Sequence, residues 1–287
     1  MPSLRDLRRK IKSIKNTEKI TKAMELVAAA KMRRAQERVV ASRPYADELR
    51  AIMRDITSRH LEYKHPYFEG REVKKRCVIL VTTDRGQVGA LNGNSIRMAL
   101  KEMKESSAPC SVVTIGRKGR DSVSRLRKEL IADVSNYGDA PTVGAILPAS
   151  RVALQQYEAG EIDQIDIVFA RFVSAGRQVA TLERLVPIEK PTADEDGPTL
   201  KGEFEYEPDA KDVLNELLPR YVEALVYQHV LENSASEQAA RMLAMHNASD
   251  NAGELIESYT LTANQVRQSN ITNDLMEIVG GVAALQG

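Results

Sequence analysis

Apolar residues in the first 60 positions repeat at the spacing of one helical stripe. The stripe is formed by Leu4, Leu7, Ile11, Ile14, Ile20, Met24 and Val27. Ser3 and Asp6 form a capping box at its start. The stripe is narrow and the other faces are charged, so we expect a seam for one partner helix. Arg43-Pro44 predicts a kink or restart, followed by helix to about residue 60.

The middle of the chain, residues 75–195, changes to short apolar runs that alternate with helical patterns. Strands are predicted at 78–81, 112–115, 165–169 and 179–188, and helices at 95–104, 119–130 and 142–157. Strand–helix alternation of this kind is typical of a small α/β domain with parallel strands. The stretch 191–208 is rich in acids, Gly and Pro, which indicates an exposed linker.

The last segment, residues 209–287, is helical in pattern from Ala210 almost to its end. After Pro219 it contains no proline, and only Gly253 interrupts it before Gly280 and Gly281. About 60 residues of helix make a rod of roughly 90 Å, which needs a partner along its length. The first 60 residues are the candidate partner. We therefore predict an antiparallel coiled coil of residues 1–60 and 209–287, with a Rossmann-like α/β domain, 75–195, inserted between them.

Charge, hydrophobicity and cysteine content indicate which partners, membrane segments and thiol chemistry to expect. The chain of 287 residues has 41 Lys and Arg against 40 Asp and Glu, yet residues 1–60 carry 16 basic and 7 acidic residues. A basic end suggests an acidic partner. No apolar stretch approaches the roughly 20 residues that span a bilayer, and no secretory signal is visible. Cys77 and Cys110 lie in strand-like runs, where we interpret them as buried side chains rather than a redox or metal pair.

Motifs for chemistry are weak. The turn Gly86–Gly93 follows a strand and precedes a helix, but its glycine spacing is neither a dinucleotide fingerprint nor a P-loop. Gly116–Arg120 is basic and also follows a strand, so an anion site there is conceivable, although a solvated helix start is the simpler interpretation. The four histidines are scattered, and no catalytic, cofactor or metal residues are predicted. The basic helix lacks aromatic residues for stacking on bases, so no nucleic-acid partner is predicted.

Both ends of the chain resemble the γ subunits of F-type ATP synthases. The resemblance rests on 16–25 and 27–36 near the start, and on 235–242, 248–252, 267–272 and 277–281 near the end. The middle departs from the family, whose usual Asp-Arg-Gly-Leu-Cys-Gly-Gly is here Asp84–Ala90, with Gln87 and Val88 in place of Leu and Cys. Any role for that turn is therefore open.

The resemblance implies a non-catalytic rotor shaft of the F1 part. Such a shaft couples transmembrane proton flow through the c-ring to the conformational cycle of the catalytic β subunits. The implied partners are three α and three β subunits, the ε subunit and the c-ring. The implied location is peripheral, on the cytoplasmic face of the bacterial inner membrane. The residues implied to contact α and β subunits are Met24, Glu237, Arg241, Arg267, Gln268 and Thr272.

Two alternatives of other classes remain open from the residues themselves. One is an α/β enzyme that binds a nucleotide at the turn Gly86–Gly93. The other is a coiled-coil adaptor that binds acidic partners through its basic helix.

Overall fold

The computed structural model describes residues 3–59, 65–188 and 209–286. The elements are α1 (Leu4–Arg59), β1 (Arg76–Val81), α2 (Leu91–Glu105), β2 (Cys110–Ile115), α3 (Arg117–Arg125), β3 (Leu130–Val134), α4 (Val143–Glu158), β4 (Gln164–Ser174), β5 (Arg177–Val186) and α5 (Ala210–Gln286). The chain divides into two compact units, one of Met1–Val27 with Met242–Gly287 and one of Ala28–Arg241. The predicted fold class, long terminal helices with a small α/β domain between them, is confirmed.

In the first unit, the start of α1 and the last part of α5 pair as antiparallel helices. His246 Nδ1 lies 3.3 Å from Glu25 Oε1, and Lys10 Nζ lies 5.6 Å from the ring centroid of Tyr259. The residue numbers of the contacting pairs thus rise along α5 as they fall along α1, which makes the two helices antiparallel. The buried side chains Leu7 on α1 and Ala252 on α5 lie in this seam. A seam this narrow matches the predicted single stripe.

Part of the predicted stripe is wrong. Ile20 and Val27 are 60% and 54% exposed, whereas Thr21 and Ala28 are buried. Thr21 and Ala28 continue the seven-residue repeat of Leu7 and Ile14, and positions seven residues apart stay on one side of a coiled-coil helix. The apolar pattern therefore predicts the wrong buried residue where a polar side chain, Thr21, occupies the seam.

In the second unit, the remainder of α1 packs against the first part of α5. Ala35 and Val39 form a buried cluster with Leu231 and Ala235. Pro44 lies inside α1, so the predicted restart is wrong. Proline removes one helical hydrogen bond, to the carbonyl of Val40, and Val40 is 61% exposed, so water can satisfy that carbonyl.

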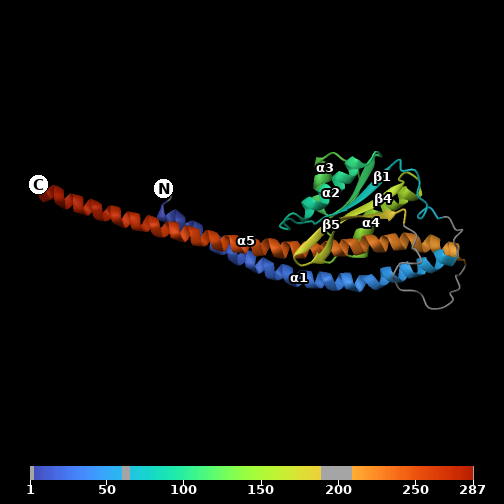
Figure 1. Cartoon of the computed structure of the whole chain (residues 1–287), viewed down its shortest axis with the longest axis horizontal. Helices are drawn as coiled ribbons and strands as arrows, with labels where there is room; N and C mark the ends of the chain where they lie inside the picture. Colours follow the sequence, from blue (N-terminus) through green and yellow to red (C-terminus); the bar gives the residue numbers. More distant parts are fainter. Residues whose placement is uncertain (1–2, 60–64, 189–208, 287) are drawn as a thin grey trace. The chain divides into compact units, whose positions relative to one another are not determined.

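The α/β domain also belongs to the second unit and is built on a five-stranded sheet of order β3-β2-β1-β4-β5. The first four strands are parallel, and β5 returns antiparallel to β4. Helices α2 and α3 cover one face and α4 covers the other (Figure 1). Both faces are covered, which explains the continuous apolar runs of the strands.

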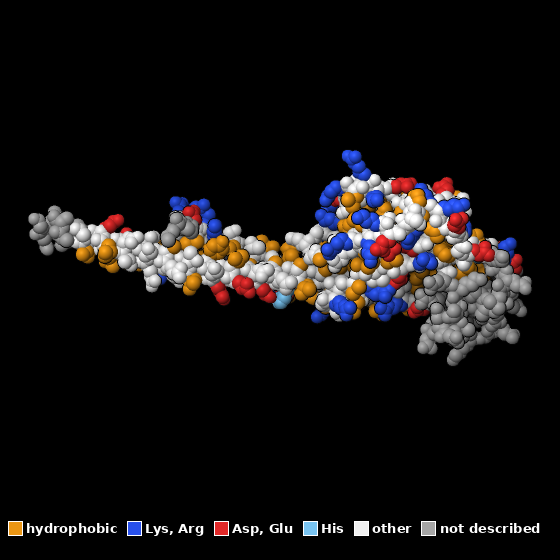
Figure 2. All heavy atoms as spheres, turned by 45° about the horizontal axis from the view of Figure 1, so that its top comes forward, with side chains coloured by type: hydrophobic (Ala, Val, Ile, Leu, Met, Phe, Trp, Pro, Cys, Tyr) orange, Lys and Arg blue, Asp and Glu red, His pale blue; other side chains and the backbone are white. Residues whose placement is uncertain are grey.

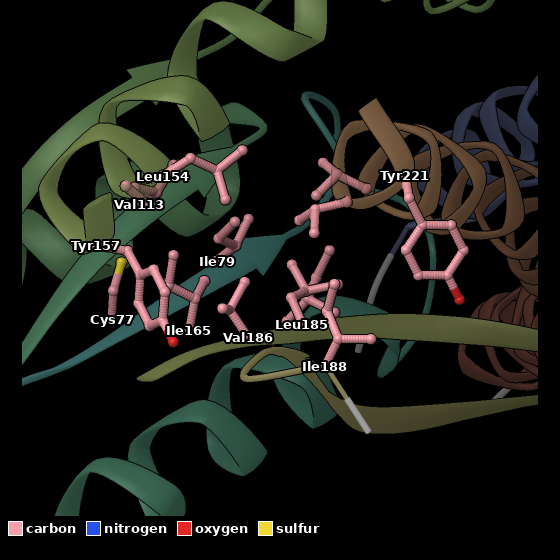
Figure 3. Packing of buried hydrophobic residues seen from close by; sticks show 14 of the residues in the cluster. Cys77, Ile79, Val113, Leu154, Tyr157, Ile165, Leu185, Val186, Ile188 and Tyr221 are labelled. Atoms are coloured by element: carbon pink, nitrogen blue, oxygen red, sulfur yellow. The ribbon is translucent and has the colours of Figure 1, made fainter. Parts of the chain in front are cut away.

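Alternate residues of β1 face opposite sides of the sheet. Val78 and Leu80 pack under α2 and α3, whereas Cys77 and Ile79 join a larger cluster with α4 and α5. Figure 3 shows residues of this larger cluster, with Tyr221 of α5 at one end of those drawn. Cys77 is buried, as its strand position predicted, whereas Cys110, at the start of β2, is only half-buried.

One strand was missed. The predicted helix 119–130 ends at Arg125, and β3 begins at Leu130 as an edge strand beside β2. The chain leaves the helix because Arg127 has φ 52°, a left-handed conformation that ends a helical run. No glycine marks this end, so the sequence pattern carried the helix too far.

Candidate partner-binding surfaces

Glu237 and Arg241 lie one helical turn apart on α5, in the second unit. Arg241 Nη2 donates to Glu237 Oε1 at 2.6 Å, and the two side chains are only 13% and 12% exposed. The same guanidinium donates to Gln238 Oε1 at 3.1 Å and to the carbonyl of Gly86 at 3.5 Å. The pair therefore connects α5 to the turn Gly86–Gly93.

Burial raises the pKa of Glu237, and the neighbouring Arg241 only partly opposes this effect. Beside Glu237 lies a hollow of about 280 Å³ at the carboxyl ends of β1, β2 and β3. Its lining residues are Asp84, Arg85, Arg117, Asn136, Tyr137, Gly138, Asp139 and Glu237. The hollow mixes both signs of charge around one nearly buried ion pair, which suits a contact with a charged protein surface.

The loop after β3 is held to α1 by two basic side chains. Lys31 Nζ donates to Asp139 Oδ2 at 2.7 Å, and Arg38 Nη1 donates to the carbonyl of Asp139 at 2.9 Å. The Lys31 hydrogen bond lowers the pKa of Asp139. Sequence analysis missed these residues, because the partners are more than 100 positions apart and no motif links them.

The turn Gly86–Gly93 is organised by its own side chains. Asn92 Oδ1 accepts from the amide of Thr83 at 3.0 Å, and its Nδ2 donates to Thr83 Oγ1 at 2.7 Å. Gly89 has φ 53°, and Gln87 has φ 64° although it is not a glycine. These contacts fix the start of α2 against the end of β1.

The amides at the start of α3, which an anion would need, are already bound within the chain. Arg117 donates its amide to Asp84 Oδ1 at 3.0 Å, and the amide of Lys118 donates to the carbonyl of Thr83 at 3.1 Å. The amide of Gly119 donates to Thr82 Oγ1 at 2.8 Å. The segment Gly116–Arg120 therefore packs α3 onto β1, and Gly116 and Gly119 are buried rather than solvated as the simpler interpretation of the sequence had it.

Helix α5 continues beyond its buried seam. Every described side chain from Arg267 to Gly280 is exposed, including Gln268 and Thr272, and Thr272 Oγ1 donates to the carbonyl of Gln268 at 3.0 Å. Large apolar side chains more than half exposed on this stretch are Ile271, Leu275, Met276, Ile278 and Val279. We call residues 267–280 the bare end of α5.

Met24 lies in the first unit, half-buried on α1. Its neighbour Glu25 is held by Lys22 at 3.0 Å as well as by His246, and the Lys22 hydrogen bond lowers the pKa of Glu25. The six residues predicted to contact partners therefore lie in three places: Met24 on α1, the pair on α5, and the bare end.

Within residues 3–59, 65–188 and 209–286, no three His, Cys, Asp or Glu side chains are grouped so as to hold a metal ion. In the same part of the chain, no helix combines the length and the apolar character needed to cross a bilayer.

Comparison with known proteins identifies the family. The family model described as "ATP synthase" matches residues 3–285. The ATP synthase gamma chain of Acidithiobacillus ferrooxidans, in two strains, is 43% identical over 99% of this chain and 100% of its own length.

Solved structures share the fold. The central stalk and c-ring structure of the Tetrahymena thermophila mitochondrial ATP synthase contains a chain with TM-score 0.62 and 26% identity, matched over 80% of this chain and 99% of that one. A chain of the Euglena gracilis mitochondrial ATP synthase matches with TM-score 0.66 and 22% identity, over 98% of this chain and 94% of that one. From the sequence matches over nearly the whole length, this chain belongs to the ATP synthase gamma-chain family.

Proposed function

We propose that this chain is the central rotor shaft of an F-type ATP synthase. In this role it couples ion flow through the c-ring to the conformational cycle of the catalytic β subunits. It has no catalytic site of its own, and it works at the cytoplasmic face of the bacterial inner membrane, held there by its partners. Its proposed partners are three α and three β subunits, the ε subunit and the c-ring, and one chain of similar fold comes from a structure described as OSCP, F1 and c-ring.

The bare end of α5 is the observation that carries this proposal. A single helix that exposes five large apolar side chains over 14 positions does not bury them within its own unit. Contiguous exposed apolar surface marks an interaction site. An apolar bearing formed by surrounding subunits would cover this end and still allow it to turn, since apolar contacts lack directional bonds.

Polar residues at the base of the bare end would supply the directional contacts. Arg267, Gln268 and Thr272 are exposed on two successive turns, so one partner loop can reach all three. An exposed arginine offers a forked donor to a carboxylate on that loop. We assign these three residues to a contact with a loop of a β subunit.

Glu237 and Arg241 are assigned to a second contact, with an acidic loop of a β subunit. Met24, in the first unit, is assigned separately to a contact with an α or β subunit. The support for Arg241 is geometric: it is paired with Glu237, which lines the hollow together with Arg85 and Arg117. Lys and Arg side chains are prominent on the α/β domain (Figure 2). Cationic surfaces of this kind speed the approach of an acidic loop.

The test is to co-express the chain with its α and β subunits, purify the complex and measure ATP hydrolysis. We expect a particle with three α, three β and one copy of this chain. Deletion from Arg267 onward is expected to weaken turnover, because the bare end is lost. A chain that purifies alone and binds neither subunit would refute the proposal.

Point variants separate the contact from the bulk of the helix. Arg267→Ala with Thr272→Ala is expected to lower turnover, whereas Gln265→Ala, an exposed position just before the bare end, serves as the matched control. Equal effects of the two sets would show that the assigned residues make no special contact.

A further inference from the structure

The end of α3 forms an exposed basic turn at the opposite end of that helix from the hollow. We define the basic turn as Arg125, Leu126, Arg127 and Lys128. The three basic residues are exposed, and Leu126 is 47% exposed between them. Within the described part of the chain, neither Arg125 nor Arg127 has a side-chain hydrogen bond or an ion pair.

The basic turn is rigid because its backbone closes α3 in a Schellman motif. The amide of Lys128 donates to the carbonyl of Val123 at 3.2 Å, and the amide of Arg127 donates to that of Ser124 at 3.1 Å. On its other side, the carbonyl of Glu129 accepts from the amide of Val112 at 2.8 Å. The side chains of the basic turn therefore project from a fixed frame.

Arg127 occupies the one position of this motif that favours glycine. Its φ of 52° is left-handed, a conformation in which a side chain is strained. Strained residues gather at functional sites, where the strain is kept for another reason. Among the residues that the structure describes, no side-chain hydrogen bond or ion pair explains why an arginine stands here.

We propose that the basic turn is a docking site for an acidic segment of a second protein. That segment presents at least two carboxylates on either side of an apolar side chain. The carboxylates would accept paired hydrogen bonds from the guanidinium groups of Arg125 and Arg127, and the apolar side chain would pack on Leu126. This contact is additional to the bare end and to the Glu237–Arg241 surface, and it stands whether or not those assignments hold.

The chemistry favours an acidic protein segment over the other anionic surfaces. A membrane-binding helix needs a broad apolar face, but the apolar side of α3 is buried, with Val123 only 4% exposed, and Leu126 stands alone. The basic turn also has no aromatic side chain to stack on bases, which counts against a single-stranded nucleic acid.

The first experiment replaces Leu126 with a photo-crosslinking amino acid in the full chain. The chain is assembled into the ATP synthase in its native membrane, irradiated, and analysed by mass spectrometry. We expect an adduct with an acidic stretch of another protein subunit. An adduct with lipid, with a stretch that lacks carboxylates, or no adduct would overturn the proposal.

Charge neutralisation tests the role of the arginines. In the crosslinking chain, Arg125→Gln with Arg127→Gln is expected to reduce adduct yield about fivefold or more. The matched control is Lys101→Gln with Lys104→Gln, two exposed lysines on α2, which should leave the yield unchanged. Equal losses in both pairs would mean a general charge effect and would overturn the proposal.

Arg127→Gly separates docking from folding. Glycine relieves the strain of the left-handed backbone, so the urea midpoint of the purified chain is expected to rise. The adduct yield is expected to fall, because one guanidinium group is lost. A merely structural arginine would not give these opposite changes. An unchanged yield in this variant and in the double glutamine variant would overturn the proposal even if both fold normally.

Discussion

Two glycines near the carboxyl ends of the strands differ in whether the structure leaves room for a side chain. A Cβ on Gly116 would lie 2.2 Å from the carbonyl oxygen of Thr82, and its φ is 105°. A Cβ on Gly93, inside α2, would meet nothing within 4 Å. The first glycine is therefore a packing requirement, and the second is not.

We expect Gly116→Ala to lower the free energy of unfolding by about 3 kcal/mol, from overlap and backbone strain together. Gly93→Ala should raise it by about 0.5 to 1 kcal/mol, because alanine suits a helix interior better. Urea unfolding followed by circular dichroism measures both. Equal effects would show that the close approach of Gly116 to Thr82 is not what the fold requires.

His229 makes the stability of the second unit depend on pH. Its ring stacks on Phe169 with centroids 4.2 Å apart, and neither ring nitrogen has a hydrogen bond, although Nε2 is 3.2 Å from Glu183 Oε2. Burial lowers the pKa of His229 from 6.5 to about 4, with Arg171 acting in the same direction and Glu232 against it.

Below pH 6.5 the unfolded chain therefore takes up a proton that the folded chain resists. Stability is expected to fall as the pH drops from 6.5 toward 4, by about 3 kcal/mol in all from this group. His229→Phe should make this acid loss shallower. Urea midpoints measured from pH 7 to pH 4 check this, and parallel curves for the wild type and His229→Phe would contradict it.

At the scale of elements, the seam of the first unit decides which apolar residues matter. Leu7 is 1% exposed, whereas Ile20 is 60% exposed on the same helix. Leu7→Ala is expected to cost about 2 to 4 kcal/mol, and Ile20→Ala no more than about 0.5 kcal/mol. Thermal unfolding followed by helical circular dichroism compares them. A larger loss of stability from Ile20→Ala than from Leu7→Ala would contradict this and would support the apolar stripe predicted from the sequence.

The sequence predicts elements well where one period persists. The helices α1 and α5 and the buried strands β1, β2 and β4 follow from apolar spacing, because one face or both faces of each are covered. β3 was missed because it is a short edge strand and the helix before it ends on Arg127 rather than glycine. The seam was misplaced where Thr21 replaces an apolar residue.

At the scale of the whole molecule, the contact surfaces were only partly predictable. Glu237 and Arg241 form an ion pair because they lie one turn apart on the same helix. The clamp of Lys31 on Asp139 depends on two elements that meet only after folding, so no local pattern reveals it.

Hydrogen exchange would show whether the bare end of α5 gains a partner. In the free chain, amides of residues 267–280 are expected to exchange fast, because an unpartnered helix end frays. After assembly with α and β subunits they should become protected, while amides of β1 stay protected in both states. Peptide-level mass spectrometry measures this. Fast exchange after assembly would contradict a bearing around this end.

The antiparallel pairing of the first unit has a consequence for synthesis on the ribosome. The segment up to Val27 is made first, and its packing partners after Met242 are made last. At about 5 to 20 residues per second, the early helix waits roughly 10 to 40 s with Leu7, Ile11 and Ile14 uncovered. We therefore expect nascent chains of this protein to bind a chaperone that shields apolar helix faces until translation ends.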